Sequence, residues 1–290
     1  MAYMIRLLNV IFINTTASIQ VKSLLNICAA IMILLSTAFS GSSQIVEPFD
    51  IRFQVNQKGG IQMISNVALT CNASNGNCAT YQNQLPPNGN HNQDGGIVME
   101  YVDIDSDGST WMSSSDSLAL PDCSEVSFAG LFWSARIQPN TTEYNNRSQV
   151  KIKIGNFLYQ TITADETFDV LSIPSNPNFS MSSYYCYKNI TPLVQASSGN
   201  ARFTLANISS QTGSNNLFGA WTIVVVYKNQ LQSMRNLTVF DGMGYVSGQN
   251  NLDIPISGFL TPTVGPVSFE LGAVSYEGDR SIQGERFQFQ

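Results

Sequence analysis

Residues 221–241, WTIVVVYKNQLQSMRNLTVFD, decide the fold class of this chain. They open with a seven-residue apolar run in which Ile223 and the three valines after it are all β-branched. A run without polar alternation belongs to a strand that is covered on both faces, in the middle of a sheet inside a large core. After a polar turn over residues 228–235, the alternating stretch NLTVFD predicts a neighbouring strand that ends at Asp241, on the rim of the sheet.

Short strand-like segments separated by Gly, Asn, Pro and Ser occupy most of the remaining chain. Residues 49–56 (FDIRFQVN) alternate between apolar and polar side chains, and residues 149–162 predict a hairpin with Gly155-Asn156 as a two-residue turn. Helical periodicity is nearly absent, so we predict an all-β fold over residues 45–290, a single antiparallel β-sandwich of jelly-roll type with roughly ten or more strands. Further strands are predicted at residues 98–104, 123–133, 201–208, 252–259 and 266–276.

Residues 1–44 have the features of a secretory signal peptide. The apolar stretch LLNICAAIMILLSTAF (24–39) follows Lys22 and is followed by the small residues SGSS. It is short for a permanent membrane span, although an anchored helix is the alternative. We therefore expect export, with cleavage between Ser40 and Gln44. Residues 1–20 add an apolar patch that a signal peptide does not need. We interpret this stretch as the result of a start codon assigned too far upstream.

Four cysteines follow this segment, and an even number in an exported chain favours disulfides. Cys71 and Cys78 bracket the turn-rich stretch NASNGN, so we expect them to pair with each other. Cys123 and Cys186 then form the second bond and close a longer loop. A metal site is the weaker alternative, because no two cysteines are spaced as CxxC and His91 is the only histidine.

The charge of the chain limits its partners. Arg6 and Lys22 precede residue 44, so 12 of the 14 basic residues and all 20 acidic residues follow it, a net charge of −8. Binding to nucleic acid needs clustered Lys and Arg, so we expect no nucleic-acid partner. Contact with a membrane is expected only through the signal peptide, during export.

A family resemblance rests on seven stretches that occur in this order: MEYVDIDSD (99–107), FAGLFWSA (128–135), YYCYKNIT (184–191), GAWTIVVVYKN (219–229), RNLTVFDGM (235–243), SGFLTPTVGPV (257–267) and YEGDRSIQGERF (276–287). Together they resemble the N-terminal module of very large secreted surface proteins of Bacteroidetes. Such proteins carry conserved repeat (DUF11) domains and a gliding-motility-associated or type IX secretion sorting domain. The resemblance implies export, a cell-surface or adhesin-like role and a β-rich module. Because the chain ends before any such repeats, we expect the domain to be truncated at its C-terminus.

Asp103, Asp105 and Asp107 stand at alternate positions before Gly108, as in the opening of a calcium-binding loop. Calcium prefers hard oxygen ligands, and three carboxylates so close together otherwise repel one another. However, Ser114 stands where the full loop needs a glutamate. We therefore favour the alternative interpretation, a strand-like segment whose acids face water, and keep calcium as a candidate cofactor.

A second group of acids combines Asp241 with Glu277, Asp279 and Glu285. Glu277 and Asp279 share one face if the preceding strand continues past Tyr276. Arginines at positions 280 and 286 favour a salt-bridged rim, and a bound cation or sugar is the alternative.

Catalysis finds little support in the sequence, because His91 lies in the loop-like stretch NGNHNQDGG, where a Ser-His-Asp triad would depend on a mobile residue. We therefore predict a cell-surface structural or adhesin-like module without catalytic activity, with surface polysaccharide or other surface proteins as partners. Tyr184, Tyr185 and Tyr187 keep a calcium-dependent carbohydrate-binding module open as an alternative. A glycoside-active enzyme is a further alternative, since its two carboxylates meet in space rather than in sequence.

Overall fold

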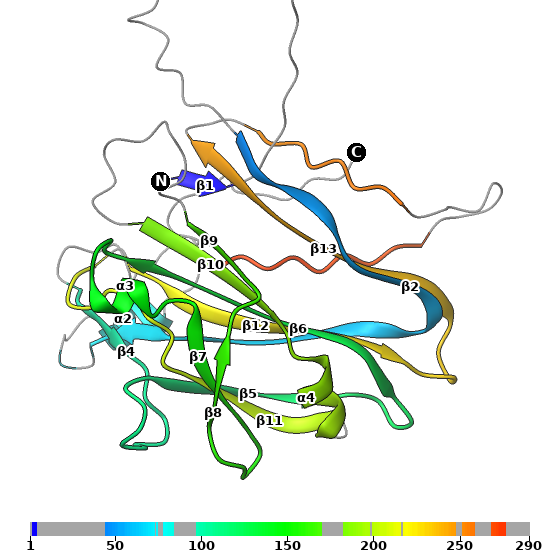
Figure 1. The fold of residues 1–290 in the computed structure, drawn as a ribbon, viewed down its shortest axis with the longest axis horizontal. Coiled ribbons are helices and arrows are strands. Elements are labelled where there is room, and N and C mark those ends of the chain that lie inside the picture. Colours follow the sequence, from blue (N-terminus) through cyan, green and yellow to red (C-terminus); the bar gives the residue numbers. More distant parts are fainter. Residues whose placement is uncertain are drawn as a thin grey trace, which may run out of the picture. The chain divides into compact units, whose positions relative to one another are not determined.

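The structure is a computed structural model of the chain. It describes residues 2–4, 44–72, 74, 78–83, 97–169, 182–197, 199–215, 217–247, 251–258 and 268–276. Antiparallel strands dominate these residues, which confirms the all-β prediction and is consistent with a β-sandwich (Figure 1). Most of the predicted signal peptide, residues 5–43, lies outside the described residues.

The chain divides into two compact units. The first combines Met1–Val55 with Thr238–Pro266, and the second combines Asn56–Leu237 with Val267–Gln290. The prediction of a single domain over residues 45–290 stays a prediction. The first unit contains β1 (Ala2–Met4), which pairs antiparallel with β13 (Met234–Ser247), and β13 is also a neighbour of β2 (Gln44–Val67).

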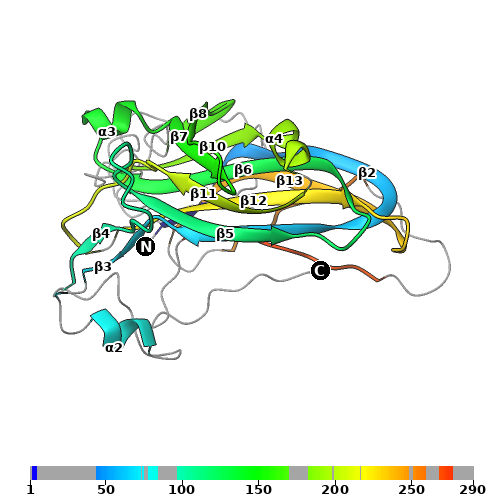
Figure 2. The ribbon, with the colours of Figure 1, turned by 90° about the horizontal axis from the view of Figure 1, so that it is seen from below.

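The second unit contains two larger sheets and a small one (Figures 1 and 2). One sheet has the order β2, β12 (Gly219–Lys228), β6 (Glu125–Ile137), β10 (Ser182–Asn189) and β9 (Glu166–Asp169). The other has the order β5 (Ser113–Ala119), β11 (Asn200–Ala206), β7 (Gln149–Ile154) and β8 (Gln160–Thr163). The small sheet pairs β3 (Leu69–Cys71) with β4 (Met99–Tyr101). The described helices are short: α2 (Cys78–Asn83), α3 (Thr142–Asn145) and α4 (Thr191–Ala196).

The apolar run at residues 221–227 is the central strand that its composition predicts. β12 lies between β2 and β6, and every residue of the run is buried. Trp221 stands opposite Trp133 of β6, and both indoles are fully buried in the core between the two larger sheets. Indole N–H groups need partners when buried: Trp221 donates to Ser114 Oγ of β5 (2.8 Å), and Trp133 donates to the carbonyl of Arg147 (3.0 Å). The first bond joins the two sheets across the core, and the second joins β6 to the turn before β7.

The C-terminal segments differ from the prediction. Residues 252–258 and 268–276 form no strand, although both lie in stretches that we predicted as strands. In the first, Pro255 has no N–H to donate to a ladder. The second lies against the sheet through side chains: the Tyr276 hydroxyl donates to the carbonyl of Phe132 (3.2 Å), and Gly272 lies against the side chain of Met63.

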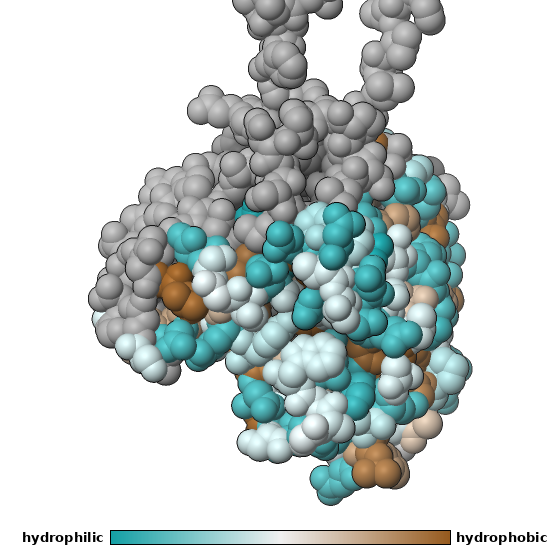
Figure 3. Space-filling view, turned by 60° about the vertical axis from the view of Figure 1, so that its left-hand side comes forward, coloured by the Kyte–Doolittle hydropathy of each residue, from teal (hydrophilic) through white to brown (hydrophobic). Residues whose placement is uncertain are grey.

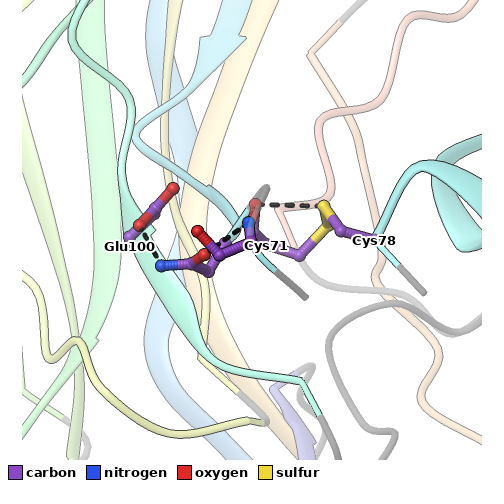
Figure 4. The surroundings of a disulfide bond; sticks show 5 residues. Cys71, Cys78 and Glu100 are labelled. Atoms are coloured by element: carbon purple, nitrogen blue, oxygen red, sulfur yellow. Dashed lines mark hydrogen bonds between the residues drawn. A yellow bond between two sulfur atoms is a disulfide. The ribbon is translucent and has the colours of Figure 1, made fainter. Parts of the chain in front are cut away.

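One predicted disulfide is confirmed, and the other prediction is wrong. Cys71 and Cys78 form a disulfide that ties β3 to α2, as Figure 4 shows. Cys123 and Cys186 are both free: Cys123 is exposed before β6, whereas Cys186 is buried in β10 opposite Trp133. The nine residues from Glu125 to Trp133 span about 26 Å of extended strand, while a disulfide needs Cα atoms within about 7 Å. Counting cysteines cannot detect this separation.

Candidate functional site

The acidic loop between β4 and β5 is folded by its own turn bonds. The Asp107 N–H donates to Asp105 Oδ1 (3.3 Å), and the Ser109 N–H donates to Asp107 Oδ1 (2.8 Å). Ser106 adopts a left-handed conformation (φ 51°), which turns the chain between the two acids. A bridge between Asp103 and Ser113 brings the loop back to the start of β5.

Asp105 binds both arms of the β7–β8 hairpin. Its Oδ2 atom accepts from Lys153 Nζ (2.5 Å) and from the hydroxyl of Tyr159 (2.6 Å). Its Oδ1 atom accepts from Ser113 Oγ (3.1 Å), which also donates to Asp103. Lys153 Nζ in turn lies 4.3 Å from the centre of the Tyr159 ring. We call Asp105, Lys153 and Tyr159 the hairpin brace.

The electrostatics of the brace favour an ionised Asp105. Burial alone would raise the pKa of this carboxyl, but hydrogen bonds from Lys153, Tyr159, Asp107 and Ser113 lower it to about 2. Burial and the nearby Asp105 carboxylate both raise the pKa of Tyr159 above its ordinary value. At neutral pH the brace is therefore a carboxylate held by an ammonium group and a protonated phenol.

The hairpin that the brace holds presents an apolar tip. Val150, Ile152 and Ile154 of β7 are buried, as their alternation predicts. Gly155-Asn156 occupies the centre of the turn, where the Phe157 N–H donates to the carbonyl of Ile154 (3.2 Å). The strand pairing ends at Ile152 opposite Gln160, so the loop is longer than the two-residue turn that the sequence predicts.

The longer loop leaves Phe157 and Leu158 in solvent, with 75% and 89% of their surface exposed. We call these two residues the apolar tip. In the sequence they follow Lys153 by four and five residues and directly precede Tyr159, the two hairpin members of the brace. Figure 3 shows a face of the molecule on which hydrophilic side chains predominate among the coloured residues.

The second predicted acid group is only partly described. Asp241 accepts two hydrogen bonds from the guanidinium of Arg52, at 3.0 and 2.7 Å, within the first unit. Asp241 is paired with an arginine, but it lies inside β13 and not at a strand end on the rim of the sheet, where the sequence predicted it. Its partner, Arg52, is also not one of the arginines that the sequence analysis considered. Glu277 and Asp279 lie outside the described residues.

Another ion pair escaped sequence analysis. Arg147 binds both oxygens of Asp169, at 3.0 and 2.6 Å, and its guanidinium lies 3.9 Å from the centre of the Tyr144 ring. Burial would lower the pKa of Arg147, but the hydrogen bond with Asp169 raises it. The alternation of side chains along β9 and β10 is the sole hint of this pair in the sequence. It does not indicate where the arginine lies.

Within the described residues, no three His, Cys, Asp or Glu side chains are grouped so that they could hold one metal ion. The oxygens of Asp105 are instead satisfied by Lys153, Tyr159, Ser113 and the Asp107 N–H. Asp103 and Asp107 are exposed, as the favoured interpretation expects, but Asp105 is held by protein groups rather than facing water. Calcium stays a candidate cofactor.

The tyrosines around Cys186 divide between two faces, as their spacing predicts. Tyr184 is buried and donates to the carbonyl of Ser209 (2.7 Å), so it is a core residue. Tyr185 and Tyr187 point the other way and join an aromatic row with Phe132 and Phe168. The ring centres are 6.0 Å apart for Phe132–Tyr185, 5.2 Å for Phe132–Tyr187 and 6.2 Å for Phe168–Tyr185.

Comparisons with known proteins identify no relative. A scan against protein-family models finds no match, and searches of the curated proteins and the solved structures find none either. In the described part of the chain, no helix is both long and apolar enough to span a membrane. The resemblance to bacterial surface modules therefore stays an expectation.

Proposed function

We propose that this chain is an exported structural module of a cell surface that makes adhesive contacts through the apolar tip. The observation that carries the proposal is the exposure of Phe157 and Leu158 on a hairpin whose two arms bind one carboxylate. Exposed apolar groups are unfavourable in water and gain free energy when a partner covers them. A loop held in one conformation also loses less entropy on binding than a loose one.

Two further observations support export and a structural role. The Cys71–Cys78 disulfide suits an oxidising compartment, where such bonds persist. Two described pairs of charged residues, Lys153–Asp105 and Arg147–Asp169, tie together strands or loops that are distant in the sequence. Such pairs stabilise a scaffold and leave its loops to contact partners. The proposal includes no catalytic activity, so turnover of a polysaccharide that disappears in acid-to-amide variants would contradict it.

Retention on surfaces tests the adhesive role. The mature protein would be passed over polysaccharide-coated and hydrophobic sensor surfaces, and the bound mass measured after washing. We expect the double variant Phe157→Ser/Leu158→Ser to lose most of the retained mass while keeping the wild-type melting temperature. The matched control is Leu231→Ser, because Leu231 is also 82% exposed but lies in the β12–β13 turn. Equal retention of the tip variant and the wild type would refute the proposal.

The aromatic row favours carbohydrate binding as a second candidate function. Sugars stack on aromatic rings, and Tyr185 and Phe168 are half-buried rather than fully covered. Calorimetric titration with polysaccharides would show heat of binding that Tyr185→Ala abolishes. Binding that survives this substitution would place any sugar site elsewhere.

A further inference from the structure

Among the described residues, no strand pairs with the second half of β2 on the side away from β12. In the ladder between β2 and β12, the even-numbered residues of β2 point their backbone N–H and C=O groups toward β12. The Asn229 N–H donates to the carbonyl of Lys58, and the Ala68 N–H donates to the carbonyl of Gly219. Successive residues of a strand point their backbone groups to opposite sides. The odd-numbered residues from Gly59 to Val67 therefore point away from β12.

The contacts of these odd-numbered residues confirm their direction. Arg235 donates to the carbonyl of Gly59 (2.7 Å), and the Ser65 N–H donates to Asp116 Oδ2 (3.1 Å). The Val67 N–H donates to the side chain of Asn66 (2.8 Å). β13 begins at Met234 and runs along the first half of β2, since Asn236 bonds to Asn56 and Thr238 bonds to Gln54.

Ile61 and Met63 form the uncapped centre of the edge. Within the described part of the chain, no side chain caps their N–H groups as Asp116 caps Ser65. Their side chains are 41% and 39% exposed. Residues 59–67 contain no charged residue and no proline, the features that usually protect a strand edge from pairing.

We propose that this edge pairs antiparallel with the same edge of a second copy of the chain. A two-fold axis at Gln62 places Ile61 of one copy opposite Met63 of the other, so that the free N–H and C=O groups of both residues find partners. Such a contact is isologous, with the same surface used by both copies. It leaves the bonds of Arg235, Asp116 and Asn66 in place.

Charge complementarity supports a second copy of the chain as the partner of this edge, paired in this register. Asp116 caps the edge at Ser65, and Arg235 caps it at Gly59, three residues on either side of Gln62. The two-fold axis therefore places Asp116 of one copy beside Arg235 of the other, twice. The uncharged centre also lets two copies of an acidic chain meet without repulsion.

The contact consists of two residues from each copy and their flanks, well below the roughly 1,600 Å² of a standard interface. We therefore expect concentration-dependent association rather than a permanent dimer. Sedimentation velocity of the mature protein, from low to high micromolar concentration, should show a reversible monomer–dimer equilibrium. Met63→Lys should abolish the dimer, because it adds a charge to the pairing edge. The control Val98→Lys, at a side chain that is 41% exposed outside this edge, should leave the dimer unchanged.

A charge exchange tests the register. Asp116→Arg and Arg235→Asp should each weaken the dimer, and the double variant should restore it, provided that the melting temperatures show all variants folded. A wild type that stays monomeric at every concentration overturns the proposal, as does a dimer that survives Met63→Lys. Slow hydrogen exchange at Ile61 and Met63 in a monomer would indicate another occupant and would also overturn it.

Discussion

Replacing Asp105 with asparagine should destabilise the protein at neutral pH and leave its stability near pH 2 almost unchanged. The substitution keeps the shape of the side chain and one acceptor oxygen, but removes the charge that Lys153 and Tyr159 contact. The fall of the Asp105 pKa from 3.8 to about 2 corresponds to about 2.4 kcal/mol, at about 1.36 kcal/mol per pKa unit. Since the side chains of Lys153 and Asp105 stay 23% and 19% exposed, water screens the pair, and we expect about 1–2 kcal/mol.

The sign of the pH dependence follows from the direction of the shift. A carboxyl whose pKa is depressed by folding contributes stability above the pKa of the unfolded chain, and this contribution disappears as the pH falls through the folded value. The difference between wild type and Asp105→Asn should therefore be constant from about pH 5 to pH 8 and should vanish between about pH 4 and pH 2.

Thermal and denaturant unfolding at pH 7, 4 and 2 would measure this difference. A loss of about 1–2 kcal/mol lowers the melting temperature by roughly 2–8 °C for a domain of this size. The matched control is Asp107→Asn, which changes an exposed acid in the same loop and should cost far less. Lys153→Met closes a double-mutant cycle, in which the two substitutions should be strongly non-additive. A loss of equal size at pH 7 and pH 2, or additive substitutions, would refute the reasoning.

The remaining predictions concern the disulfide, the free thiols, the Arg147 pair and calcium. Replacing Cys71 and Cys78 with serine should lower the free energy of unfolding by about 2–3 kcal/mol in denaturant titrations, because the bond closes a short loop; an unchanged midpoint would contradict this. Cys123 should react with maleimide in the native protein and Cys186 only after unfolding, since burial raises the pKa of the Cys186 thiol to about 12; similar labelling rates would argue against the buried position. Arg147→Met leaves Asp169 without the guanidinium that binds both its oxygens and should cost about 1–3 kcal/mol; an unaltered melting temperature would count against this pair. Millimolar calcium should not raise the melting temperature of the wild type, and a rise that Asp103→Asn removes would restore the calcium interpretation.

The local part of the fold was predictable from the sequence. The apolar run at residues 221–227 has no polar face, so only a strand buried on both sides accommodates it, and β12 is such a strand. The alternation in VKIKI likewise placed Val150, Ile152 and Ile154 in the core. These features depend on the period of a strand, which neighbouring residues alone determine.

The site was not predictable, because its members come together only through the tertiary fold. Asp105 lies 48 residues before Lys153, and Arg52 lies 189 residues before Asp241. The local sequence around each aspartate does not indicate which basic residue it pairs with. The acids of the 103–107 loop therefore suggested calcium, whereas the neighbouring hairpin provides a lysine and a tyrosine. The predicted Cys123–Cys186 disulfide was wrong for the same reason. The sequence shows how many cysteines there are, but it does not show that an extended strand separates these two.

The most direct test of this account is the pKa of the Asp105 carboxyl, followed by carbon-detected NMR through an acid titration. We predict a pKa near 2 in the wild type, unchanged by millimolar calcium and raised in Lys153→Met, where the hydrogen bonds from Tyr159, Asp107 and Ser113 remain. An ordinary pKa in the wild type, or a large change of the Asp105 signal on adding calcium, would contradict the hairpin brace.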